Sequence, residues 1–134
     1  MSVDWMSQDC LLACCIVVAR VLVGFYFVFF VFWNYVHKEA AIDVMRQRSL
    51  PYPVVLFSFG LLIELVAGLL VMLGVWLLPA AAVLIVFAVF ATFIYHCFWL
   101  MDKGPERTLN TIIFIGNLTI SLSALLFVIG TSAI

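Results

Sequence analysis

Four strongly polar side chains stand out because each interrupts an otherwise apolar stretch of the sequence. They are Arg20, Glu64, His96 and Asn117. A charged group at the centre of a bilayer costs about 2.5–3.5 kcal/mol on insertion scales, so it faces other helices and finds a partner there. Such residues mark sites for a proton, an ion, a quinone headgroup or a small polar substrate. We therefore take these four residues as candidates for binding a ligand, and the sequence gives none of them a catalytic role.

Each of the four polar residues shares a helix face with small side chains. Residues three or four apart lie on one face of a helix, and small residues let membrane helices approach closely. The residues that share these faces are Gly24 with Arg20, Gly60 and Gly68 with Glu64, Ala88 and Thr92 with His96, and Ser121 and Ala124 with Asn117. These are the faces expected to point into a bundle.

Counting inward from the ends of the apolar stretches predicts which polar residues meet. At 1.5 Å of rise per residue, Arg20 lies about 14 residues deep and Glu64 about 10, a difference of roughly 6 Å. The sequence therefore predicts an Arg20–Glu64 ion pair, extended by Asn117 and by His96. Two interpretations stay open: the pair only fixes helix register, or it lines a functional site. Beside Arg20 the Glu64 carboxyl would be ionised, and without that cation it would carry a proton.

The four cysteines form no recognisable metal or redox motif. Cys10, Cys14 and Cys15 cluster at the start of the first apolar stretch. Cys97 belongs to the opposite membrane face, so a disulfide to the cluster is excluded by geometry. A soft-metal site at the cluster is the alternative, but small apolar side chains facing lipid or neighbours explain it more simply. We expect no metal, because no zinc-ligand pattern occurs.

The elements that position these residues follow from composition. Of the 134 residues 68% are hydrophobic and 10% are charged, against roughly 25% charged in soluble domains. Four stretches reach the roughly 20 apolar residues that a membrane helix needs, and they cover about 10–34, 54–76, 79–100 and 109–130. Barrel strands alternate apolar and polar residues, so strands are excluded. We predict an all-α, antiparallel four-transmembrane-helix bundle that forms a single membrane domain over residues 1–134.

The distribution of charge predicts how the chain lies in the membrane. Lysine and arginine occur in the loops 35–53 and 101–108, and outside them only at Arg20. The positive-inside rule places both loops in the cytoplasm and both termini outside, as for a multi-pass protein of a bacterial inner membrane. Interfacial aromatic residues agree with this orientation. They are Trp33, Tyr35, Tyr52 and Trp99 at the inner boundary and Trp5 and Trp76 at the outer one.

The segment between the first two spans is too polar to cross a bilayer. Val36, Ala40, Ile42 and Met45 form a weak apolar stripe there. We expect a short interfacial helix that ends before Pro51 and Pro53, with a solvated loop as the alternative. The net charge of −1 leaves no basic patch for nucleic acid, so the expected partners are the lipid bilayer, a protein subunit or a second copy of the chain.

The same polar and small residues resemble those of the DoxX-like family of small four-helix membrane proteins. The matching positions are Arg20, Gly24 and Phe27 in the first helix, Leu50 and Pro51 before the second, Glu64, Gly68 and Gly74 within it, His96 and Trp99 at the end of the third, and Asn117 in the fourth. Their order and spacing extend from about Arg20 to Gly130. Ser49 stands where the family has the glycine of a Gly-x-Pro segment.

The resemblance implies several functions. Some relatives are subunits of a thiosulfate:quinone oxidoreductase, others resemble membrane anchors for thiol and oxidative-stress defence, and distant ones act as assembly factors. We expect an accessory membrane subunit of a quinone- or thiol-linked redox system, non-catalytic or touching quinone, with no cofactor held by the chain itself. An assembly or chaperone-like partner of membrane proteins and a transporter of a small solute or proton are the alternatives.

Overall fold

The computed structural model describes the backbone of residues 2–133 and the side chains of residues 7–133. The chain forms α1 (Ser2–Val36), α2 (Lys38–Gln47), α3 (Pro53–Leu73), α4 (Leu77–Tyr95), a 3-10 turn (Phe98–Leu100), α5 (Pro105–Gly116), a π-helical turn (Asn117–Ser121) and α6 (Leu122–Thr131). The described residues contain helices and no strands, as the sequence predicts. The side chain of Trp5, predicted at the outer boundary, lies outside the described part.

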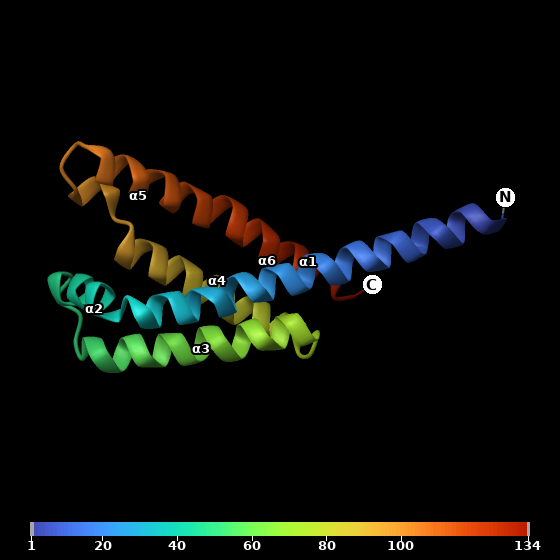
Figure 1. Ribbon diagram of the computed structural model, residues 1–134, viewed down its shortest axis with the longest axis horizontal. Coiled ribbons are helices and arrows are strands. Elements are labelled where there is room, and N and C mark those ends of the chain that lie inside the picture. Colours follow the sequence, from blue (N-terminus) through green and yellow to red (C-terminus); the bar gives the residue numbers. More distant parts are fainter. Residues whose placement is uncertain (1, 134) are drawn as a thin grey trace.

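Four stretches of the described chain are long and apolar enough to cross a membrane. They are Ser7–Val36, Pro53–Leu73, Leu77–Leu100 and Pro105–Thr131. The fourth is built from α5, the π-helical turn and α6 in succession (Figure 1). The predicted antiparallel bundle of four transmembrane helices is therefore confirmed, and so is the short helix between the first two spans, which is α2.

The ends of the helices follow from their sequence. Pro53 and Pro105 open α3 and α5, where the missing proline N–H would have no partner in any case. Gly74 ends α3 with φ 74°, a left-handed conformation that glycine adopts without steric cost. The following two residues lead directly into α4, so the turn between α3 and α4 is tight. We call this side of the bundle the turn end, and the opposite side the α2 end.

Helix α1 packs against α3 at two glycines. A Cβ atom built on Gly24 would lie 2.6 Å from the Gly68 carbonyl oxygen and 2.8 Å from the Met72 nitrogen, and closer still to the Met72 side chain. Such distances leave room for no side chain at all. The Gly24–Gly68 approach therefore sets the register of α1 against α3, as small residues do between membrane helices.

The interior of the bundle divides into two halves. The apolar core consists of Phe27, Ala67, Val71, Ala80, Ala81, Leu84, Leu125 and Val128, all buried. Phe27 comes from α1, and the others come from the parts of α3, α4 and α6 nearest the turn end, so that half of the bundle is closed by apolar side chains. In Figure 1 α4 leans away from α3 toward the α2 end. The two halves of the interior therefore differ in character.

Helix α2 lies across the space between α3 and α4. It contacts both helices, and its Met45 is buried with 5% of its surface exposed. Arg48 follows α2, and its Nε donates a hydrogen bond to the Ile94 carbonyl oxygen at 3.2 Å. A cation at the C-terminus of α4 also interacts favourably with the helix dipole. Helix α2 thus covers the α2 end of the bundle.

Candidate functional site

Glu64 points into the bundle interior. On α3 it lies one turn from Gly60, which faces Phe87 of α4, and one turn from Gly68, which faces Phe27 and Val28 of α1. A residue midway between these two faces is directed toward the centre of the four helices. Accordingly, only 3% of its surface is exposed.

The Glu64 carboxyl group is buried without a hydrogen-bond partner in the described structure. Its Oε2 atom is buried and accepts no hydrogen bond within the described structure. Tyr95, at the last residue of α4, is close enough for an electrostatic interaction with the carboxylate. A buried, unpaired carboxyl group is costly, so the Glu64 side chain calls for a partner from outside the described structure.

A hydrogen bond joins α4 to the π-helical turn near the middle of the fourth span. The Asn117 Nδ2 donates to Thr92 Oγ1 at 3.2 Å, and Thr92 is buried with 1% of its surface exposed. Asn117 is the first residue of the π-helical turn. Such turns widen a helix locally and recur at functional sites, and here the turn begins at the residue that contacts Thr92.

His96 belongs to a second polar contact at the α2 end. Its Nδ1 lies 2.7 Å from Asn110 Oδ1 of α5. Because the Asn110 Nδ2 already donates to the Glu106 carbonyl oxygen, Asn110 Oδ1 accepts and His96 Nδ1 carries the hydrogen. No hydrogen bond or ion pair joins His96 to Glu64 in the described part, so the predicted extension through His96 is not formed directly.

Arg20 lies elsewhere, and the predicted Arg20–Glu64 ion pair is not formed. The guanidinium carbon and its two terminal nitrogens lie 2.8–2.9 Å from the position of a Cβ on Gly74, so the group rests on the glycine at the turn end. Gly74 is ten residues beyond Glu64 on the same helix, about 15 Å away at helical rise. Among the described side chains, the one ion pair is Arg46–Asp43 on α2, at 3.2 Å.

Two physical reasons explain this correction. The Gly24–Gly68 contact sets the register of the antiparallel helices, and it brings Arg20 opposite Gly74 while Glu64 lies one turn past Phe27 and Val28. In addition, side chains lean toward the N-terminus of their own helix. Arg20 therefore leans toward the turn end and Glu64 toward the α2 end, so the two diverge. Counting residues from the ends of apolar stretches misses both effects.

The candidate site therefore consists of Glu64 on α3, which interacts electrostatically with Tyr95, and of the hydrogen-bonded pair Thr92 and Asn117. Thr92 and Tyr95 lie three residues apart on α4, and we refer to these four residues together as the polar cluster. Two of its members, Glu64 and Asn117, are predicted from the sequence alone. Tyr95 is missed because a tyrosine in an apolar stretch is not unusual, and Thr92 is assigned only to a helix face. Their spacing contains a usable signal, since Tyr95 and His96 follow Thr92 by three and four residues at the end of α4.

No hydrogen bond in the described structure joins a cysteine to the polar cluster. Cys10, Cys14 and Cys15 are exposed on the N-terminal part of α1, and Cys97 is buried at the α2 end. The N-terminal part of α1 extends beyond the rest of the bundle (Figure 1). Within the described residues no three His, Cys, Asp or Glu side chains lie close enough together to hold a metal ion.

These features define a class of protein. Four apolar helices with a polar cluster in their interior describe an integral, multi-pass membrane protein whose outer surface contacts the lipid bilayer. The sequence model of the DoxX family matches residues 15–97, and this chain belongs to that family. The match includes Arg20, Glu64 and Thr92 and ends before Asn117. No curated protein and no solved structure shows a significant match to the chain.

Proposed function

We propose that this protein is an accessory membrane subunit of a redox system and that its polar cluster receives a quinone headgroup. The observation that carries the proposal is the buried Glu64 carboxyl group, whose Oε2 has no hydrogen-bond partner. The carbonyl oxygens of a quinone accept hydrogen bonds, and the hydroxyl groups of its reduced form donate them. Glu64 can serve both forms, as a donor when it is protonated and as an acceptor when it is ionised.

The neighbouring side chains suit the same ligand. In this proposal Tyr95 and Asn117 offer a hydroxyl group and an amide to the second oxygen of the ring, and the amide also donates a hydrogen bond to Thr92. Reduction of a quinone takes two electrons and two protons. In this proposal the electrons come from the redox cofactor of a partner protein, and the polar cluster supplies protons at the quinone oxygens.

The division of the interior supports this function over transport. The apolar core lies between Glu64 and the turn end, where Val71, Leu84 and Leu125 are fully buried. A solute bound at Glu64 would therefore meet closely packed apolar side chains on one side. An interior closed in this way suits a group that binds and stays better than a substrate that crosses the bundle. By the positive-inside rule we place the α2 end in the cytoplasm and both termini outside, in a bacterial inner membrane.

One outward-facing feature offers a surface for a partner protein. On α1 the rings of Phe29, Trp33 and His37 stack in succession, and Phe25 packs against Phe29. Phe25, Phe29 and Trp33 are each about half exposed, so this aromatic stripe faces outward along the bundle. A partner helix could pack on it, whether the partner is a redox subunit, a client protein or a second copy of this chain.

Binding of short-chain quinones and quinols tests the proposal. The protein is purified in mild detergent and titrated while tryptophan and tyrosine fluorescence is recorded. Glu64→Leu should weaken binding by about tenfold or more, because a hydrogen bond to an ionisable group contributes roughly 1.5–3 kcal/mol. The matched control is Glu106→Gln, on the exposed first turn of α5, which should leave the affinity unchanged. Equal affinities for the Glu64→Leu variant and the wild type would refute the quinone site.

Two further readouts separate the alternatives. Proteins that copurify in mild detergent are identified by mass spectrometry, and a redox partner is expected among them. A client protein that copurifies equally well with Glu64→Gln would favour the assembly function. Uptake of a solute by proteoliposomes that is abolished by Glu64→Gln would favour transport.

A further inference from the structure

Among the described residues, no anion pairs with the membrane-embedded cation Arg20. Its Nε atom is buried and has no hydrogen-bond partner in the described structure, and its guanidinium group rests on Gly74 at the turn end. Among the described residues the other lysines and arginines begin at Lys38 and belong to the α2 end or the 101–108 loop. The C-terminal end of the α3 dipole favours a cation at this position, and an anion from outside the chain would complete its pairing.

The position of Arg20 restricts what that anion can be. Helix α3 has 21 residues, which span about 31 Å and match the roughly 30 Å hydrocarbon core of a bilayer. Its last residue therefore lies at the edge of the hydrocarbon, where phospholipid phosphates begin. Trp76, two residues after Gly74, is 74% exposed, as is typical of tryptophan at this depth.

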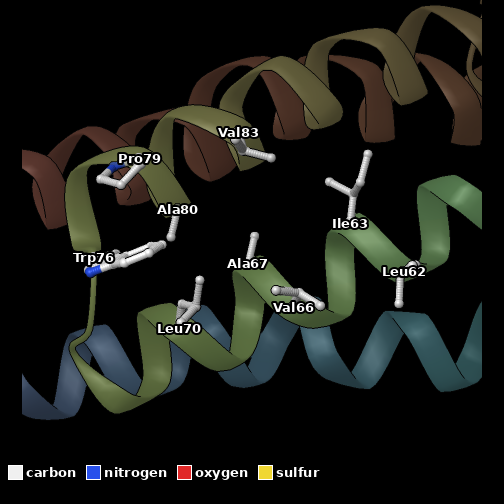
Figure 2. A pocket seen from close by; sticks show the side chains of 9 residues that line it. All are labelled: Leu62, Ile63, Val66, Ala67, Leu70, Trp76, Pro79, Ala80 and Val83. Carbon is white, nitrogen blue, oxygen red and sulfur yellow. The ribbon is translucent and has the colours of Figure 1, made fainter.

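An apolar groove between α3 and α4 begins at the same turn. It has a volume of about 340 Å³ and is lined by Leu62, Ile63, Val66, Ala67, Leu70, Trp76, Pro79, Ala80 and Val83. In Figure 2 Ile63, Ala67 and Val83 point into the space between the two helices, and Trp76 lies at the turn. Leu62, Val66 and Val83 are about half exposed, so the groove opens toward lipid along its length.

We propose that the turn end binds one phospholipid, whose phosphate pairs with Arg20 while one of its acyl chains lies in the α3–α4 groove. Arginine matches phosphate through paired N–H donors, and Gly74 leaves the guanidinium group the space to lie beside the turn. The groove offers the chain an apolar lining that reaches from the turn for about 12 Å along α3, from Leu70 to Leu62. This site shares no residue with the polar cluster, so it does not depend on the proposed quinone function.

Native mass spectrometry of the purified protein titrated with phosphatidylglycerol tests this site. Arg20→Gln should weaken binding by about tenfold or more, since a charge-assisted bond to phosphate is lost. Lys103→Gln, which removes a cation from the other end of the molecule, should bind as the wild type does. Val83→Phe fills the groove and should also reduce binding, whereas Val86→Phe, on an exposed face of α4 outside the groove, should not.

A diacylglycerol with the same acyl chains but no phosphate shows how much the phosphate contributes to binding. It should bind the wild type as weakly as phosphatidylglycerol binds Arg20→Gln. Far-UV circular dichroism checks that the variants are folded. If Arg20→Gln does not fold, the comparison of Val83→Phe with Val86→Phe decides the result. Binding of phosphatidylglycerol that is unchanged in Arg20→Gln, or unchanged in Val83→Phe, would overturn the site. A quinone that occupies the groove, and whose affinity is unchanged in Arg20→Gln, would also overturn the site.

Discussion

At the scale of single residues, the central feature is a carboxyl group buried without a partner. Glu64→Leu removes this group and keeps a similar volume, so it should raise the free energy of unfolding by about 1–3 kcal/mol. The same variant should lose quinone binding, because stability and function conflict at this position. Titration with a denaturing detergent in mixed micelles measures the change, with Glu106→Gln as the control. A loss of stability would mean that the protein itself satisfies Glu64.

The hydrogen bond between Thr92 and Asn117 allows a second measurement. Thr92→Val and Asn117→Leu, singly and together, form a double-mutant cycle. The coupling energy should be about 0.6 kcal/mol and no more than about 1.7 kcal/mol, the range measured between membrane helices. A coupling energy of zero would show that the two side chains do not interact in the folded protein.

The sequence identifies the polar side chains of the site better than it identifies their partners. Glu64 and Asn117 are predictable, because a polar residue in an apolar stretch must face the interior. The pairing of Glu64 with Arg20 is not predictable from depth alone. Which residues meet depends on the register fixed by Gly24 and on the opposite lean of side chains in antiparallel helices. Neither is visible in one helix taken by itself.

At the scale of helices, the contact between α1 and α3 depends on the absence of a side chain. Gly24→Ala should lower the free energy of unfolding by about 1–3 kcal/mol, because its Cβ would collide with backbone atoms of Gly68 and Met72. Gly116→Ala is the matched control. Gly116 has helical dihedral angles, and a Cβ built on it would have no atom within 4 Å. The substitution should therefore raise the free energy of unfolding by up to about 1 kcal/mol, because alanine has the higher helix propensity. Equal effects of the two substitutions would contradict the close approach.

The helices themselves are predictable because lipid restricts the choice of structure. With no water to satisfy backbone groups, an apolar stretch of this length must be helical, and prolines and Gly74 define the ends. The π-helical turn is different, because one extra residue in a turn leaves no compositional trace. It begins at Asn117, whose hydrogen-bond partner Thr92 belongs to another helix, and the sequence of the fourth span alone does not show this contact.

At the scale of the whole molecule, the cysteines report how the chain lies across the membrane. Cys10, Cys14 and Cys15 are exposed at one end, while Cys97 is 7% exposed at the other. A membrane-impermeant maleimide added to intact cells should label the first three in a Cys97→Ser variant. It should not label a variant that retains only Cys97. Labelling restricted to permeabilised cells would reverse the proposed orientation.

The apolar core between Arg20 and Glu64 has an electrical consequence. A proton that reaches Glu64 from the α2 end must return to that end, since Val71, Leu84, Leu125 and Val128 offer it no hydrogen-bonding group on the other side. The bundle should therefore insulate the membrane even while the proposed quinone chemistry takes place at Glu64. An energised membrane that contains it should keep its voltage, and vesicles with the protein should hold a pH gradient as long as empty vesicles do.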